Sequence, residues 1–393
     1  MIGGGFTGLC AALAAAEKGA VTVLLEAETI GFAASGRNGG QIHTGLRKDQ
    51  ADLERWLGPV HARELWTLSE AAKAHLRALI ERHAIACELK SGLVIAAHNA
   101  GAARALAKDT AHLAEQYGYR DARTLNRDEI RAALGTANYA GGRFDMGGGH
   151  LHPLKFARGL AMAAERAGAA LWEHSPALAI EADGPRAMVR LAQGTVSADR
   201  VILATDAFTA GLAPSLEPYI GHVESFMTAT APLPPDLARK ILPCDAAVAD
   251  TRHVLDYYRK SADGRLLFAG REAYCGMPAD IAALVRPRML HVYPALARVP
   301  TEYGWSGTVG ITRTRMPHFG RLGERVLFVH GYSGQGVALS CLGGQILAEA
   351  ALGAPERFDV FARVPAQAFP GGRWLRRPLV AAALLGFKVL DSF

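Results

Sequence analysis

The most constraining feature of this chain is a run of glycines at its start. The sequence opens Ile2-Gly3-Gly4-Gly5-Phe6-Thr7-Gly8, which is a GxGxxG pattern at positions 3, 5 and 8. With 43 glycines in the chain such a pattern is weak evidence alone, so its context decides. Leu9 to Lys18 is alanine-rich with strong helix propensity. Gly19 follows at the position expected for a helix C-terminal cap.

A strand and an acidic residue complete this unit. Val21 to Leu25 is a β-type run that ends on Glu26, and that acid follows Gly8 at close to the roughly 20-residue spacing expected of a ribose-binding carboxylate. Gly3 allows the tight turn, Gly5 lets the backbone approach a pyrophosphate, and Gly8 allows close packing of the helix. The N–H groups and dipole of that helix face the phosphates. The pattern therefore predicts a Rossmann-type dinucleotide site.

The first strand of the predicted unit is short. About five apolar residues are expected before the first glycine, and here only Met1 and Ile2 precede it. Because that strand lies centrally in a Rossmann sheet, its loss leaves two ladders unpaired in the core. We therefore expect the natural protein to begin upstream, with Met1 standing for the last valine of a VVVIGGG strand whose GTG codon was taken as a start.

Three further segments favour FAD over NAD. Ala33 to Gln41 is a polar, glycine-dense loop able to lie along an extended cofactor. Val201 to Ala207 is typical of a buried strand that returns to the nucleotide fold. Arg325 to His330 is a second strand, followed by the glycine loop Gly331 to Gly336 and the helical run Val337 to Ala351. The expected cofactor-binding residues are Gly3, Gly5, Phe6, Thr7, Gly8, Glu26, Ala27, Ser35, Gly36, Arg37, Asn38, Gly39, Gly40, Gln41, Thr205, Gly331, Tyr332, Ser333, Gly334, Gln335, Gly336 and Val337.

Composition narrows the classes of protein to which the chain could belong. The 393 residues, half of them hydrophobic, fit two closely packed domains. The net charge of +6 is spread without a basic run, so no nucleic-acid partner is expected. No apolar run reaches the roughly 20 residues of a membrane span. The apolar tail Leu379 to Leu390 is expected to be a docked terminal helix.

Cysteine usage indicates a reducing compartment. The five cysteines are scattered, without a CxxC motif or a Cys/His cluster, so neither a disulfide framework nor a metal site is expected. We expect a cytoplasmic protein.

Seven motifs carry a family resemblance: IGGGFTGL, ASGRNGGQ, GHLHPLKFARGLA, ADTRHVLDYYR, MPHFGR, GYSGQGVAL and FPGGR. Together they resemble the D-amino acid oxidase-type FAD-dependent oxidoreductases, and most of all the gamma-glutamylputrescine oxidase branch. The resemblance implies an α/β fold (α+β overall). A discontinuous Rossmann-type FAD-binding domain (residues 1–85, 148–215 and 306–393) would interleave with a mixed or antiparallel-sheet substrate domain (residues 86–147 and 216–305).

The resemblance also implies a reaction. The expected substrate is a small-molecule amine, either gamma-glutamylputrescine or a related N-substituted amine or amino acid. Hydride transfer to flavin N5, imine hydrolysis and reoxidation by oxygen would follow. The helix after Gly331 to Gly336 is expected to stabilise negative charge at flavin N1 and C2=O. Sarcosine oxidase relatives attach their flavin through a C-terminal cysteine. Thr308 to Leu322 contains none, so we expect non-covalent FAD.

Two alternatives stay open at this point. One is a D-amino acid dehydrogenase-like enzyme with an acceptor other than oxygen, and the other is a truncated non-catalytic remnant. An NAD-dependent dehydrogenase would leave the segment Ala33 to Gln41 and the GYSGQG segment unexplained.

Candidates for the substrate side are few, and no acid–base dyad stands out. Tyr257, Tyr258 and Arg259 lie on a predicted strand, where alternation sends Tyr258 to one face and its neighbours to the other. Tyr258 is a candidate to wall the pocket, Arg259 to hold a carboxylate, and Trp305 to line the site. Packing roles for the aromatic side chains, and solvent exposure for Arg259, remain equally open. Three histidines without metal-ligand companions are expected to cap or pack: His43, His150 and His152.

The remaining pattern predicts a mixed domain layout. Helices are expected at Leu53–Ala84, Ala103–Tyr117 and from His152-Pro153 to Ala167. Strands are expected at Ser91–Ala97, Leu171–Glu181, Ala187–Leu191 and Thr195–Thr205. An antiparallel substrate sheet is expected from Val223–Ala231, Val254–Arg259 and Arg265–Gly270.

Overall fold

A parallel sheet forms around the first residues of the chain. In the computed structural model, which describes residues 1–209, 211–273 and 278–370, Ile2 forms a parallel bridge to Leu25 on one side and to Leu203 on the other. The position expected for the first Rossmann strand is thus the centre of the sheet. The strands follow in the order β6 (Ala170–Trp172), β1 (Val23–Leu25), Ile2, β10 (Val201–Leu203), β17 (Val326–His330) and the antiparallel β16 (His318–Leu322).

The two faces of this sheet are covered differently, because side chains alternate along each strand. Leu24, Ile202 and Leu327 belong to a core shared with helices. Those helices are α1 (Phe6–Glu17), α4 (Pro59–Arg82), α7 (Pro153–Arg166) and α10 (Gly336–Ala351). Leu25 and Leu203 face the other way, against a small antiparallel sheet. That sheet consists of β7 (Ala179–Glu181), β8 (Ala187–Leu191) and β9 (Gly194–Ala198).

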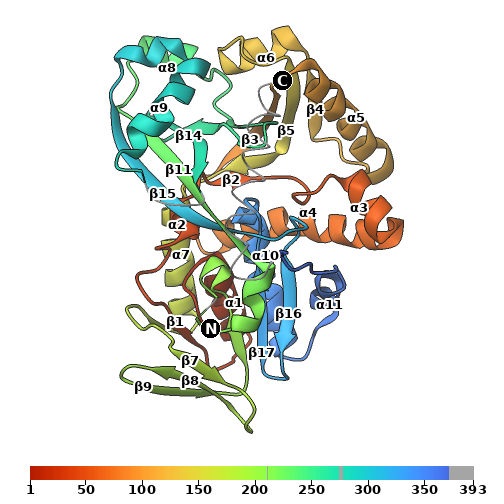
Figure 1. Ribbon diagram of the computed structural model, residues 1–393, viewed down its shortest axis with the longest axis vertical. Coiled ribbons are helices and arrows are strands. Elements are labelled where there is room, and N and C mark those ends of the chain that lie inside the picture. The colour runs from red at the N-terminus through yellow and green to blue at the C-terminus, as the bar shows by residue number, and fades with distance from the viewer. Residues whose placement is uncertain (210, 274–277, 371–393) are drawn as a thin grey trace.

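A nine-stranded mixed sheet occupies the upper half of the molecule in Figure 1. Eight strands follow in the order β15 (Thr301–Ile311), β11 (Gly221–Thr230), β14 (Leu266–Ala273), β13 (Tyr257–Lys260), β12 (Ala247–Asp250), β3 (Lys90–Ala97), β5 (Gly141–His150) and β2 (Gln41–Ile42), and β4 (Ala122–Leu125) pairs with β5. Helix α9 (Ile281–Val292) packs on one face of this sheet, over a core that includes Phe226, Tyr258 and Phe268. The remaining helices are α2 (Ala34–Arg37), α3 (Gln50–Leu57), α5 (Ala100–Tyr117), α6 (Arg127–Leu134), α8 (Pro235–Lys240) and α11 (Glu356–Ala362).

The two sheets are joined through continuous strands. Strand β5 runs across the domain boundary expected at residue 148, and β15 runs across the one expected at 306. The short strand β2 pairs with β5, which brings the end of the segment 33–41 onto the edge of the nine-stranded sheet. The division into a FAD-binding and a substrate domain stays a prediction.

Several predicted elements are interrupted in the structure. The helical stretch expected from Leu53 to Ala84 is broken at Gly58, where φ is +83° and Pro59 begins the second helix. Two expected strands are each divided in two: Leu171–Glu181 into β6 and β7, and Thr195–Thr205 into β9 and β10. The segment 33–41, expected as a loop, contains the single-turn helix α2.

Within the described residues no single helix is both long and apolar enough to cross a bilayer; α10 and α11 meet those criteria only as a pair bent by 118°. The predicted terminal helix Leu379–Leu390 and Cys275 lie outside the described residues.

Candidate functional site

The glycine turn at the start of the chain fits a closely bound phosphate. Gly3 has φ +108°, and a Cβ there would lie 2.6 Å from the Ala204 carbonyl oxygen. A Cβ on Gly8 would lie 1.9 Å from the Gly3 carbonyl oxygen. Helix α1 begins at Phe6, and Gly5 caps it without a side-chain hydrogen bond. The turn therefore brings backbone close to backbone at the N-terminus of a buried helix, which is the arrangement that a pyrophosphate needs.

Glu26 lies beside this turn at the end of β1. Its carboxylate accepts hydrogen bonds from the Gly4 N–H at 2.5 Å and from the Glu28 N–H at 3.0 Å. This is the place expected for a ribose-binding acid, because the carboxyl end of the second strand adjoins the glycine turn. Ala27 follows it directly.

The segment from Ser35 to Gln41 connects the turn to the nine-stranded sheet. The Ser35 hydroxyl accepts a hydrogen bond from the Phe6 N–H at 3.0 Å. Asn38 fixes the segment locally, since its side-chain oxygen accepts from the Gly40 N–H at 2.6 Å. At the far end Gln41 donates through Nε2 to the Val248 carbonyl at 2.8 Å. The segment thus runs along the junction between the two sheets.

The second glycine segment meets the first across the core. Gly331 and Gly334 have φ of +77° and +91°, and Ser333 between them has +55°. Tyr332 lies with its phenol oxygen 2.8 Å from the Thr7 hydroxyl. Helix α10 starts at Gly336 and lies beside α1 (Figure 1). The two expected glycine motifs therefore form one region, and Gln335 and Val337 flank the start of α10. Thr205 adjoins it, because its amide nitrogen is 3.4 Å from the position of a Cβ on Gly3.

The substrate-side candidates separate onto two faces of the nine-stranded sheet. Tyr258 is buried in the core beneath α9, with its ring stacked on Phe268 at 5.2 Å, so its position favours a packing role. Tyr257 faces the other way, as strand alternation predicts. Its hydroxyl lies 2.8 Å from the Ser225 hydroxyl, and its ring adjoins Gly39. Tyr257 and not Tyr258 is the tyrosine that meets the segment 35–41.

Arg259 and Trp305 hold that same segment. The Arg259 Nε donates to the Gly39 carbonyl at 2.7 Å, and its side chain is 3% exposed. Burial lowers the pKa of Arg259 to about 10. The Trp305 indole nitrogen donates to the Arg37 carbonyl at 2.8 Å. Both side chains therefore position the expected cofactor segment, and the guanidinium of Arg259 is committed to backbone carbonyls.

A second arginine was missed by the sequence reasoning. Among the described residues, no hydrogen bond or ion pair engages the Arg47 guanidinium. Burial is the main cause that lowers its pKa, followed by the charge of Arg315, while Glu272 raises it. Glu272 lies opposite Ser225 in the β11–β14 ladder. Arg47 therefore lies in the same charged surroundings as the sheet face that carries Tyr257.

His43 belongs to these surroundings too. Burial, and next the charge of Arg47, lower the pKa of His43 to about 4, so the imidazole is neutral at neutral pH. His43 directly follows β2, and Arg47 lies a little further along the same segment. His152 takes a capping position and His150 a buried one. His152 is the N-cap of α7, with its ring nitrogen 3.4 Å from the Lys155 N–H, and His150 is buried on β5.

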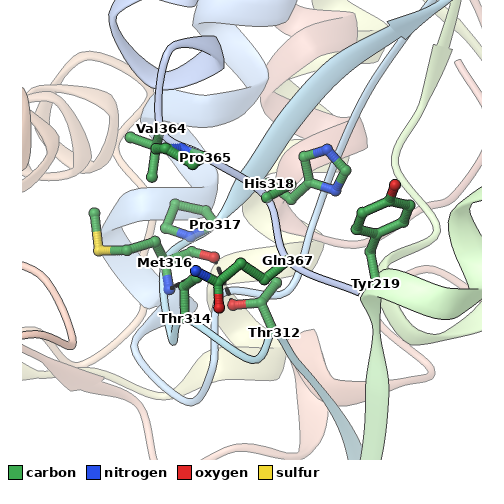
Figure 2. A pocket seen from close by; sticks show the side chains of 10 residues that line it. Tyr219, Thr312, Thr314, Met316, Pro317, His318, Val364, Pro365 and Gln367 are labelled. Carbon is green, nitrogen blue, oxygen red and sulfur yellow. Dashed lines mark hydrogen bonds between the residues drawn. The ribbon is translucent and has the colours of Figure 1, made fainter. Parts of the chain in front are cut away.

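The cavity shown in Figure 2 is too small for a cofactor or a substrate. It is lined by residues of the segment 312–318, of the segment 364–367 and by Tyr219. Its volume of about 10 Å³ is on the scale of one water molecule. Within the cavity wall the Thr312 hydroxyl donates to the Met316 carbonyl at 2.6 Å.

The described thiols and metal-ligand side chains form no further candidate site. Cys10, Cys87, Cys244 and Cys341 are free thiols. In the part of the chain that the structure describes, no group of three or more His, Cys, Asp or Glu side chains is arranged to hold a metal ion.

Comparison with known proteins agrees with this geometry. The family described as FAD dependent oxidoreductase (DAO) matches residues 1–350. A probable oxidoreductase OrdL from Rhizobium meliloti (strain 1021) is 38% identical over the whole of this chain and 92% of its own length. The gamma-glutamylputrescine oxidoreductase of Escherichia coli (strain K12) is 37% identical over the same shares.

Solved structures give the same fold. The glycine oxidase from Geobacillus kaustophilus superposes with a TM-score of 0.77 at 21% identity, covering 89% of this chain and 93% of that one. The L-proline dehydrogenase from P. horikoshii gives a TM-score of 0.75 at 17% identity, with coverage of 91% and 96%. The expected α/β fold class with a Rossmann-type FAD-binding domain is thereby confirmed.

Proposed function

The chain belongs to the DAO family of FAD-dependent oxidoreductases, which act on amine or amino acid donors, and from this premise we propose that its substrate is an amine that also carries a carboxylate, with gamma-glutamylputrescine as the first candidate. The 37% identity to the Escherichia coli gamma-glutamylputrescine oxidoreductase over the whole chain supports this substrate class. The observation that carries the proposal is Arg47, a guanidinium near Glu272 that no described residue pairs.

The residues proposed to hold FAD are those of the two glycine segments and the stretch between them. The turn from Gly3 to Gly8 holds the pyrophosphate, and Glu26 holds the adenosine ribose. Ser35 to Gln41 lies along the cofactor toward the nine-stranded sheet. Gly331 to Gly336 presents the N-terminus of α10 to the flavin ring. The proposed FAD domain comprises residues 1–85, 148–215 and 306–393, and the substrate domain residues 86–147 and 216–305.

Bound FAD supplies a hydride acceptor for the carbon that bears the substrate nitrogen. The chain contributes the placement of the substrate. Arg47 binds the carboxylate through a charge-assisted hydrogen bond, which is strong where water is excluded. His43 is neutral and therefore does not compete with Arg47 for that anion. The ring of Tyr257 forms a wall beside the segment 35–41.

An absorption spectrum followed by anaerobic reduction tests this function. The purified protein is expected to show flavin bands, and gamma-glutamylputrescine added without oxygen should bleach them. Putrescine, which has the amine and no carboxylate, is the matched control and should bleach them far more slowly. Flavin bands that neither compound bleaches would reject the proposed substrate class. Equal rates with both compounds would reject the role of the carboxylate.

The electron acceptor is proposed to be oxygen. After reduction by substrate, admission of air should restore the flavin bands within seconds and release peroxide. A protein that turns over only with an artificial acceptor would be a dehydrogenase of the same fold.

A further inference from the structure

The turn that follows β10 contains an acidic residue in an unusual setting. Asp206 has φ +45°, in the left-handed region that L side chains rarely adopt. One carboxylate oxygen accepts a hydrogen bond from the Gly331 N–H at 2.6 Å, and the other accepts from the Gly310 N–H at 3.2 Å. A single side chain thus ties together the end of β10, the end of β15 and the start of the Gly331–Gly336 segment.

The surroundings are shaped around this carboxylate. A Cβ on Gly310 would lie 2.6 Å and 2.8 Å from the two carboxylate oxygens, so glycine at that position gives the acid its space. Ser333 completes the same junction, since its N–H donates to the Gly310 carbonyl at 3.1 Å and its hydroxyl accepts from the Thr312 N–H at 3.2 Å. The junction therefore fixes the segment from both sides.

The hydrogen-bond partners of this carboxylate suit its ionised form. Burial is the largest effect and raises the pKa of Asp206 above its usual value, whereas hydrogen bonds from the backbone at Gly331, Gly310 and Ala207 act in the opposite direction. Its contacts within the described residues are N–H donors, and a protonated acid would have no acceptor among them. No cationic side chain of the described residues pairs with it. A half-buried carboxylate held by backbone N–H groups therefore lies at the start of the segment that leads into α10.

We propose that Asp206 is a positioning residue for the flavin: it clamps the Gly331–Gly336 segment to β15, and its charge lowers the reduction potential of bound FAD. Reduction adds negative charge to the flavin ring, and a nearby anion that no described cationic side chain pairs disfavours that change. The same anion opposes the positive end of the α10 dipole. The inference rests on the proposed placement of FAD between the two glycine segments.

Two variants of Asp206 test its hydrogen bonds and its charge separately from its unusual backbone conformation. Asp206→Asn keeps the size of the side chain and tolerates the positive φ, while removing the charge and one acceptor. Asp206→Gly removes the whole side chain and relieves the backbone strain. Asp199→Asn removes an equal charge from an exposed side chain in the turn before β10 and is the matched control.

The measurements are the FAD dissociation constant and the midpoint potential of the holoprotein, by equilibration with a reference dye. Both Asp206 variants should favour flavin reduction at least tenfold over the wild type, which is a rise of about 30 mV for a two-electron couple. They should also bind FAD several-fold more weakly, and Asp199→Asn should change neither quantity.

Each result tests one part of the proposal. Unchanged potentials in both variants would overturn the electrostatic role, even if FAD binds more weakly. A glycine variant with wild-type affinity would overturn the clamp and leave Asp206 as a turn residue. These readouts use a chemical reductant, so failure of the proposed amine to bleach the wild-type flavin would reject only the substrate. A wild type that binds no FAD would reject the cofactor placement itself.

Discussion

The phenol of Tyr332 and the hydroxyl of Thr7 lie 2.8 Å apart, although 325 residues separate them in the sequence. This contact joins the first glycine motif to the second, and both side chains are buried. Beside it Gly344 lets the two helices touch, because a Cβ there would lie 2.2 Å from the Thr7 carbonyl oxygen. This hydrogen bond and the close approach of the two helices therefore join the two halves of the proposed cofactor site.

Removing this hydrogen bond should loosen the site without unfolding it. Tyr332→Phe and Thr7→Val are each expected to lower the free energy of unfolding by about 1 kcal/mol, with a coupling of about 0.5–1.5 kcal/mol in the double variant. FAD affinity should fall in all three proteins. Denaturant unfolding and FAD titration give both quantities, and strictly additive single-variant effects would show that the contact is not formed.

The glycine at position 8 should be irreplaceable for a steric reason. In Gly8→Ala the new methyl group would lie 1.9 Å from the Gly3 carbonyl oxygen, so helix α1 must move away from the turn. We expect a loss of about 1–3 kcal/mol in stability and no retention of FAD after gel filtration. Gly194→Ala is the control, because nothing lies within 4 Å of a Cβ there. A yellow Gly8→Ala protein would contradict the proposed pyrophosphate site.

Arg47, which is half-buried, and Arg259, which is buried, should give opposite kinetic signatures. Arg47→Gln is expected to raise the KM for gamma-glutamylputrescine by about ten- to a hundredfold, because a charge-assisted hydrogen bond of about 1.5–3 kcal/mol is lost. Its FAD affinity should stay unchanged. Arg259→Gln should instead weaken FAD binding, since it releases the Gly39 carbonyl. Steady-state kinetics with excess FAD separates the two, and a KM effect confined to Arg259→Gln would reverse the assignment.

Acid should destabilise the protein through its buried histidines. His318 Nδ1 and His330 Nε2 lie 2.9 Å apart, and burial lowers the pKa of His330 to about 3, followed by the effect of His318. An unfolded histidine has a pKa of about 6.5, so the unfolded chain binds the proton first. The stabilising contribution is complete above about pH 6.5 and is lost progressively as the pH falls toward 3, by a few kcal/mol in total.

The variant His330→Gln should show a shallower fall in unfolding free energy between pH 7 and pH 5 than the wild type. His174→Gln, at an exposed position, should keep the wild-type slope. Equal slopes in all three proteins would place the acid-sensitive groups elsewhere, for example at the half-buried His43 or the buried His150.

The cofactor should be released when the protein unfolds. The stretch Thr308–Leu322 contains no cysteine, and the four cysteines that the structure describes lie outside it in the sequence. Acid precipitation of the holoprotein should leave the flavin in the supernatant and a colourless pellet. Flavin fluorescence that stays with the denatured chain on an electrophoresis gel would show a covalent bond.

The parts of the fold that the sequence predicted are those set by local interactions. The turn at Gly3, the helix over the alanine-rich stretch and the strand before Glu26 depend on backbone freedom and helix propensity within a few residues. Strand alternation likewise predicted that Tyr257 and Tyr258 would point to opposite faces. The breaks at Gly58 and in the segment 195–205 were missed because those predictions used only the periodicity of apolar residues. The residues that cause the breaks are present in the sequence.

Tertiary structure decided which face each side chain meets. Helix α9 covers one face of the nine-stranded sheet, so Tyr258 becomes a core residue and Tyr257 meets the segment 35–41. Arg259 donates to the Gly39 carbonyl, whereas Arg47 is a half-buried guanidinium that no described residue pairs. Asp206 reads in sequence as one acid in a polar turn, and only the approach of Gly310 and Gly331 makes it a junction. The sequence thus determined the elements and the glycine motifs, whereas contacts between residues a hundred or more positions apart depend on how the two sheets pack, which no local pattern encodes.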